Sequence, residues 1–121
     1  MSYEFYKVTH IVGILMLFCG LAALWGVTRL GGTITRHIRV SLGLLHGIGM
    51  VVVLVSGFGL LARLGVFGSI PTWAWVKMGI WLLLGGSMVL AKRKSHWGIS
   101  LILLWLTFGG FAAYLAINKP F

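Results

Sequence analysis

The few charged residues of this chain separate long apolar stretches. Of its 121 residues, 60% are hydrophobic and 9% are charged, whereas about 25% are charged in ordinary soluble domains. Residues 8–28, 40–62 and 95–118 carry no Lys, Arg, Asp or Glu, and in residues 64–91 Lys77 alone interrupts the apolar run. A helix needs about 20 residues to cross a hydrocarbon layer of roughly 30 Å. The pattern therefore indicates a membrane protein and excludes a soluble domain or a disordered tail.

We expect each stretch to be an α-helix, because lipid leaves an open backbone without hydrogen-bond partners. The runs are continuously apolar and lack the two-residue alternation of strands. Helices are predicted at residues 5–28, 40–62, 72–91 and 97–117. Because the connections are short, consecutive helices should be antiparallel neighbours. The predicted fold is all-α, an integral membrane up-down four-helix bundle forming a single domain over residues 1–121.

Glycine, proline and polar residues mark the predicted helix ends. They are Gly31 and Gly32 in the first connection, Gly65 and Gly68 in the second, Pro71 and Thr72 before the third helix, and Asn118 and Pro120 after the fourth. The first stretch should be a retained helix rather than a signal peptide, since Glu4 cancels Lys7 and removes the positive n-region.

The net charge of +9 comes from 10 Lys and Arg residues against one acid. Because these residues punctuate apolar runs, we expect lipid headgroups as their partners and no nucleic acid. The first and third connections hold most of them: Arg29, Arg36, Arg39, Lys92, Arg93 and Lys94, against Lys7, Arg63 and Lys119 on the other side. The positive-inside rule then places both termini outside, with a bacterial inner membrane as the expected location.

Ionisable residues inside spanning segments are candidates for a functional site. His10 and Lys77 should lie at similar depth near the outer side, with Gly13 leaving room for a flat group beside the imidazole. Trp73 and Trp81 stand one turn on either side of Lys77. The alternatives are a His10 bonded to water or headgroups, and a lysine that snorkels or contacts the tryptophans.

His46 enters from the opposite side of the membrane, on a helix face that also carries Gly43, Gly49 and Gly57. The alternative to ligation is packing, because Gly43 and Gly47 form a small-xxx-small pattern that brings helix backbones together. The depths of His10 and His46 should differ by about 10–15 Å. They are therefore expected to serve separate sites rather than one metal ion.

The single acid, Glu4, excludes paired-carboxylate hydrolysis and a Ser-His-Asp triad and disfavours calcium or magnesium sites. The histidines are too scattered for zinc. A histidine-bound cofactor remains, and haem fits, because imidazole binds iron and lysine can meet the propionates. The candidate cofactor-binding residues are His10, Lys77, His46, Lys7, Gly13, Trp73 and Trp81, with His10 and His46 as candidate iron ligands.

Three short motifs carry a resemblance to a known family. Residues 7–11 (KVTHI) resemble the K-x-x-H-I opening of the HemJ-type protoporphyrinogen oxidases. Residues 54–61 resemble the L-x-x-G-x-x-L-L end of their second helix. Residues 75–84 (WVKMGIWLLL) resemble their W-x-x-K third helix, although Trp75 and Lys77 are one residue closer together here. Copper-resistance D-like membrane domains are similar. The resemblance implies a b-type haem, with His10 as iron ligand and Lys77 as an essential cation. It also implies oxidation of a porphyrinogen or another membrane redox step.

Two other functions stay open. Soft ligands suit a copper-handling protein, and the chain offers Met16, Cys19, Met50 and Met88. A non-catalytic, homo-oligomeric scaffold or channel would use close-packing surfaces made of small residues. Those surfaces are the pairs Gly85–Gly86 and Gly109–Gly110, with Ala112, Ala113 and Ala116.

Overall fold

A computed structural model describes residues 2–66 and 68–118. In this part the chain forms four α-helices and a short 3-10 helix, η1 (Ser95–Trp97), without any strand. The α-helices are α1 (Tyr3–Arg29), α2 (Arg36–Arg63), α3 (Thr72–Arg93) and α4 (Ile99–Asn118). All four are long and apolar enough to cross a membrane. The all-α, four-helix prediction is confirmed.

The helix ends explain where the bounds differ from those predicted. Helix α2 begins before residue 40, because the Thr35 hydroxyl accepts a hydrogen bond from the backbone N–H of Ile38 at 3.2 Å and caps the first turn. Helix α4 begins at Ile99, because Gly98 has a φ of 69° and interrupts the helix after η1. Gly31, with a φ of 75°, ends α1 as predicted. Lys119 and Pro120, the latter expected to end α4, lie outside the described residues.

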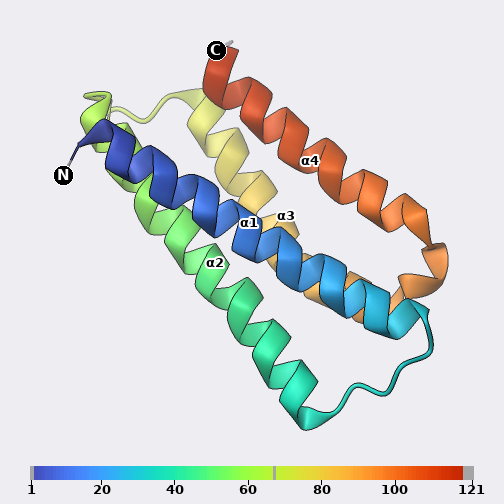
Figure 1. Cartoon of the computed structure of the whole chain (residues 1–121). Coiled ribbons are helices and arrows are strands. Elements are labelled where there is room, and N and C mark those ends of the chain that lie inside the picture. Colours follow the sequence, from blue (N-terminus) through green and yellow to red (C-terminus); the bar gives the residue numbers. More distant parts are fainter. Residues whose placement is uncertain (1, 67, 119–121) are drawn as a thin grey trace.

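Each connection reverses the direction of the chain (Figure 1). Helices α1 and α2 pack together most closely, whereas α4 packs mainly against α3. Residues 30–35 and 94–98 lie together at one end, which we call the basic end because Arg29, Arg36, Arg39, Lys92, Arg93 and Lys94 border it. The first turn of α1, residues 64–66 and 68–71, and the last turn of α4 lie at the other end, which we call the terminal end.

The core is narrow, and much of the helix surface is apolar. Leu17, Leu21, Leu101, Trp105 and Leu115 are almost fully buried. Large apolar side chains are exposed on every helix, among them Ile11, Leu15, Val51, Val55, Leu82, Leu83, Leu103 and Leu106. Water would make so much exposed apolar surface costly, whereas lipid tails would not.

Candidate functional site

Glycines bring the backbones of α1 and α2 into direct contact, in what we call the α1–α2 seam. A Cβ atom placed on Gly49 would lie 2.7 Å from the backbone nitrogen of Leu17 and 2.9 Å from the carbonyl oxygen of Gly13. A Cβ atom on Gly20 would lie 2.8 Å from Cβ of His46. Side chains at these positions would push the helices apart. The seam therefore sets the positions of His10 and His46, which both lie along it.

The seam corrects two expectations about glycines. Gly13 leaves no open space beside His10, because Val52 and Val53 of α2 fill it, with Cγ1 of Val52 2.8 Å from a Cβ placed there. Gly43 and Gly47 do not bring helices together, since a Cβ on either would meet nothing within 4 Å. Helix α2 approaches α1 at Gly49 instead, which lies on a different side of α2 from Gly43 and Gly47.

His10 is oriented by a hydrogen bond across the seam. Its Nδ1 lies 2.9 Å from Oγ of Ser56, a residue that is 2% exposed. The Ser56 hydroxyl itself donates to the carbonyl oxygen of Val52 at 2.5 Å, so its oxygen accepts from Nδ1–H of His10. Nε2 of His10 then carries the ring's lone pair. A histidine that ligates a metal usually has this arrangement, with its other ring nitrogen donating.

Gly57 and Lys77 complete the surroundings of His10. A Cβ on Gly57 would lie 3.4 Å from Cε1 of His10, so the absence of a side chain admits the ring. Gly57 thus faces His10 across the seam, on the same side of α2 as His46, as the sequence pattern predicted. The Lys77 ammonium, on α3, is near enough to His10 for the two to interact electrostatically. The imidazole is half-buried, so this end of the seam is partly open at the surface of the helices.

The other candidate residues near Lys77 have different surroundings. Trp73 is buried, with 8% of its surface exposed, in the first turn of α3. The indole nitrogen of Trp81 donates to the carbonyl oxygen of Met50 at 3.0 Å and so ties α3 to α2. Lys7 is exposed on α1. The structure therefore groups His10 with Lys77, Ser56 and Gly57, of which the sequence analysis named the first two as site residues.

His46 lies deep in the seam and away from His10. Its Nδ1–H donates to the carbonyl oxygen of Leu17 at 3.1 Å, and the residue is 4% exposed. Its Nε2 has no hydrogen-bond partner among the described residues. His46 and Ser56, the partner of His10, are ten positions apart on α2, or about 15 Å at 1.5 Å per residue. The two imidazoles therefore belong to different levels of the seam.

Histidine, cysteine and acidic side chains do not form a metal-binding cluster in the part of the chain that the structure describes. Within residues 2–66 and 68–118, no group of three or more His, Cys, Asp and Glu side chains could hold a metal ion. Met16 packs near Gly49 of α2, whereas Cys19 is exposed. Met16 and Cys19, two of the four sulfur side chains proposed for copper, thus have different surroundings.

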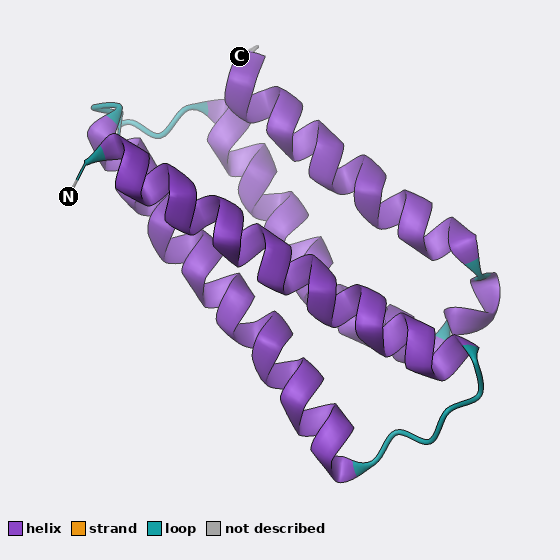
Figure 2. Ribbon diagram, in the orientation of Figure 1, coloured by secondary structure: helices purple, strands orange, loops and turns teal. Residues whose placement is uncertain are grey.

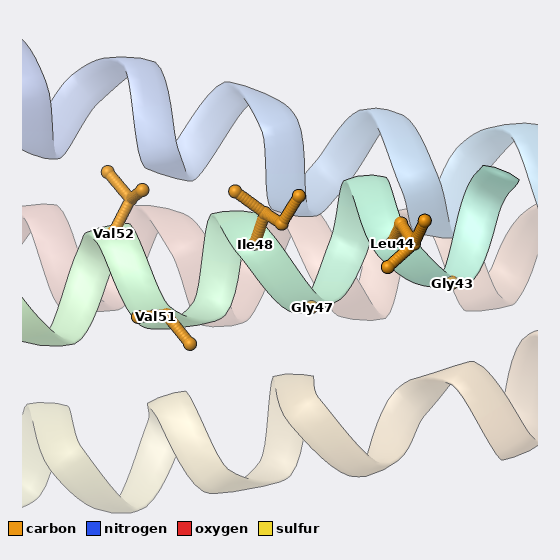
Figure 3. A pocket seen from close by; sticks show the side chains of 6 residues that line it. All are labelled: Gly43, Leu44, Gly47, Ile48, Val51 and Val52. Atoms are coloured by element: carbon orange, nitrogen blue, oxygen red, sulfur yellow. The ribbon is translucent and has the colours of Figure 1, made fainter. Parts of the chain in front are cut away.

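Two hollows lie elsewhere on the described part of the molecule. The first, of about 310 Å³, is lined by α2 residues alone: Gly43, Leu44, Gly47, Ile48, Val51 and Val52 (Figure 3). The second, of about 250 Å³, lies between α1, α2 and α3 at the basic end. His10 and Lys77 line neither of them.

Comparisons with protein-family models, curated proteins and solved structures gave no match. The class of the protein is therefore defined by its own features: an all-α chain with four membrane-length apolar helices. Its distinguishing feature is a histidine–serine hydrogen bond across a glycine-rich helix seam, within electrostatic range of Lys77.

Proposed function

We propose that the chain is an integral membrane protein whose helices cross a bacterial inner membrane as an up-down bundle. The length of the four helices and the apolar side chains exposed on them support this proposal. The basic end faces the cytoplasm, because Lys and Arg residues are enriched in cytoplasmic connections. Both termini then face outward, and the group around His10 lies near the outer side.

We further propose that this protein binds a b-type haem through His10. The observation that carries the proposal is the hydrogen bond from Nδ1 of His10 to Ser56, which leaves Nε2 with the lone pair that iron requires. Lys77 supplies a positive charge within electrostatic range of the ring, suited to a propionate. Bound haem would supply one-electron redox chemistry.

The positions of the histidines suit a haem whose iron has a single histidine ligand, His10, from this chain. His46 lies too far along the seam to be a second ligand at the same iron. Because His10 is half-buried and lines neither hollow, this chain alone would not enclose the macrocycle. Lipid or a second copy of this protein would cover the part of the macrocycle that the chain leaves exposed. The redox role, electron transfer or oxidation of a porphyrinogen, rests on the resemblance to the HemJ-type oxidases.

Haem uptake by histidine variants tests the proposal. We expect full-length protein purified in detergent to show a Soret band after expression with ample haem. His10→Ala should lose that band. His37→Ala is the matched control, because His37 is exposed at the start of α2, and it should keep its haem. Equal haem content in both variants, or no Soret band in the unaltered protein, would refute the proposal.

A second candidate function is a non-catalytic oligomeric scaffold. The open glycines Gly43 and Gly47 favour it, since they leave a hollow on α2 into which a helix of another copy could pack (Figure 3). Cross-linking in membranes distinguishes this function. Oligomers that form without haem, and that Gly47→Leu abolishes, would support the scaffold; a monomer at all concentrations would exclude it.

A further inference from the structure

The second hollow, which we call the basic-end groove, combines an apolar wall with two cations. Its lining residues come from the end of α1, the connection that follows it, the first turns of α2 and the end of α3. Figure 2 shows α2 diverging from α1 at this end of the molecule. Its apolar wall consists of Leu24, Ile34, Gly43, Met88 and Val89. Arg39, from the start of α2, and Lys92, from the last turn of α3, also line it.

Among the described residues, no acidic side chain lies near either cation. The only acidic residue, Glu4, stands in the first turn of α1, at the terminal end. Arg39 and Lys92 lie at the basic end, so the length of the helices separates them from that carboxylate. An anion that neutralises both must therefore come from outside the chain.

We propose that the basic-end groove binds one anionic phospholipid. The phosphate would lie between Arg39 and Lys92, and part of an acyl chain would follow Gly43, Met88 and Val89. Basic pockets between membrane helices on the cytoplasmic side recognise acidic headgroups in this way. A phospholipid matches both parts of the groove, since its phosphate meets the cations and its chain meets the apolar wall. The inference rests on the proposed membrane insertion and is independent of haem.

The test measures lipid binding to the full-length protein in a zwitterionic detergent by native mass spectrometry. Phosphatidylglycerol should bind more tightly than phosphatidylcholine. Replacing both cations, Arg39→Gln with Lys92→Gln, should weaken phosphatidylglycerol binding roughly thirtyfold, because each basic residue near the surface contributes about a factor of five. The matched control is Arg36→Gln with Arg93→Gln. It removes the same charge from the same end, outside the groove, and should keep the affinity.

A second pair of variants tests the apolar wall without changing charge. A Cβ on Gly43 or on Gly47 meets nothing within 4 Å, so a side chain has room to begin at either position. Gly43→Leu fills the groove and should reduce phosphatidylglycerol binding at least fivefold. Gly47→Leu, which lies outside the groove, should not change it.

Three results would overturn the proposal. They are equal affinity for the two lipids, equal losses in the groove variants and their controls, and competition by inorganic phosphate as effective as by phosphatidylglycerol. The absorption spectrum of the Arg39→Gln, Lys92→Gln protein separates this proposal from the haem proposal, because its haem content should match that of the unaltered protein. Labelling of the connections tests membrane insertion independently.

Discussion

At the scale of single residues, the orientation of His10 depends on the hydroxyl of Ser56, a small polar residue in the apolar helix α2. Ser56 donates to Val52 within its own helix and accepts from His10 across the seam. The first bond decides the direction of the second, because a hydroxyl has only one proton to give. Ser56 thus determines which nitrogen of His10 is available to a ligand.

Substitution of Ser56 should therefore weaken haem binding without removing it. We expect Ser56→Ala to lower haem affinity by roughly 10–100-fold, the usual effect of losing the partner of a ligating histidine. A haem titration followed by absorbance measures the change. Ser87→Ala is a matched control, since Ser87 is equally buried and its hydroxyl donates to Leu83 within α3. Similar affinities for the two variants would mean that Ser56 does not orient the ligand.

The sequence predicted His10 and Lys77 as site residues from their type and their depth in the helices. It could not predict Ser56, because that requires knowing which face of α2 meets α1. His10 and Lys77 stood out because ionisable side chains are rare within apolar helices. Ser56 did not, although Gly57, the residue after it, was correctly placed on the face of α2 that carries His46. Each helix is apolar on all sides, so its sequence contains little information about which face meets a neighbour. The pairing of α1 with α2 had to be known before Ser56 could be assigned to His10.

At the scale of helices, the α1–α2 seam is the most closely packed part of the fold. Lipid tails are as apolar as leucine, so burial gives helices little reason to associate in a membrane. Close backbone contact through Gly13, Gly20 and Gly49 provides the van der Waals packing instead. The seam should therefore contribute much of the stability of the helix pair.

Two neighbouring glycines of α2 make this expectation testable. Gly49→Ala places a methyl group 2.7 Å from the backbone nitrogen of Leu17, so the helices must separate. Overpacking of this kind costs about 1–3 kcal/mol. Gly47→Ala is the control, because its methyl group meets no atom within 4 Å and alanine favours the helix. Unfolding in detergent should show a loss for Gly49→Ala alone, and equal stability of the two variants would contradict the packing described.

Helix number and approximate bounds could be predicted because charge spacing marks the apolar segments directly. The start of α2 was missed by a turn, since His37 and Arg39 look like loop residues until the Thr35 cap is recognised. The small-xxx-small pattern at Gly43 and Gly47 was misleading for another reason. The pattern shows that close approach is possible, and it does not specify whether the partner lies within the same chain.

At the scale of the whole molecule, the distribution of charge predicts the orientation that the chain would have in the proposed membrane. A cysteine-free background, Cys19→Ala, allows single cysteines to be placed in the connections. With both termini outside, Ser69→Cys in the second connection should react with a membrane-impermeant maleimide in intact cells. Thr33→Cys in the first connection should react only after the cells are opened. The reverse pattern would invert the proposed orientation, and labelling of both in intact cells would contradict it.

The two seam histidines lie too far apart to bind the same iron, and this determines the number of imidazole ligands that a bound haem would have. If His10 alone binds the iron, each haem has one imidazole ligand from this protein. Electron paramagnetic resonance of the ferric, haem-loaded protein measures this directly. We predict a high-spin signal that His10→Ala removes and His46→Gln leaves unchanged. A low-spin signal of two imidazole ligands, or a protein that takes up no haem, would contradict the account.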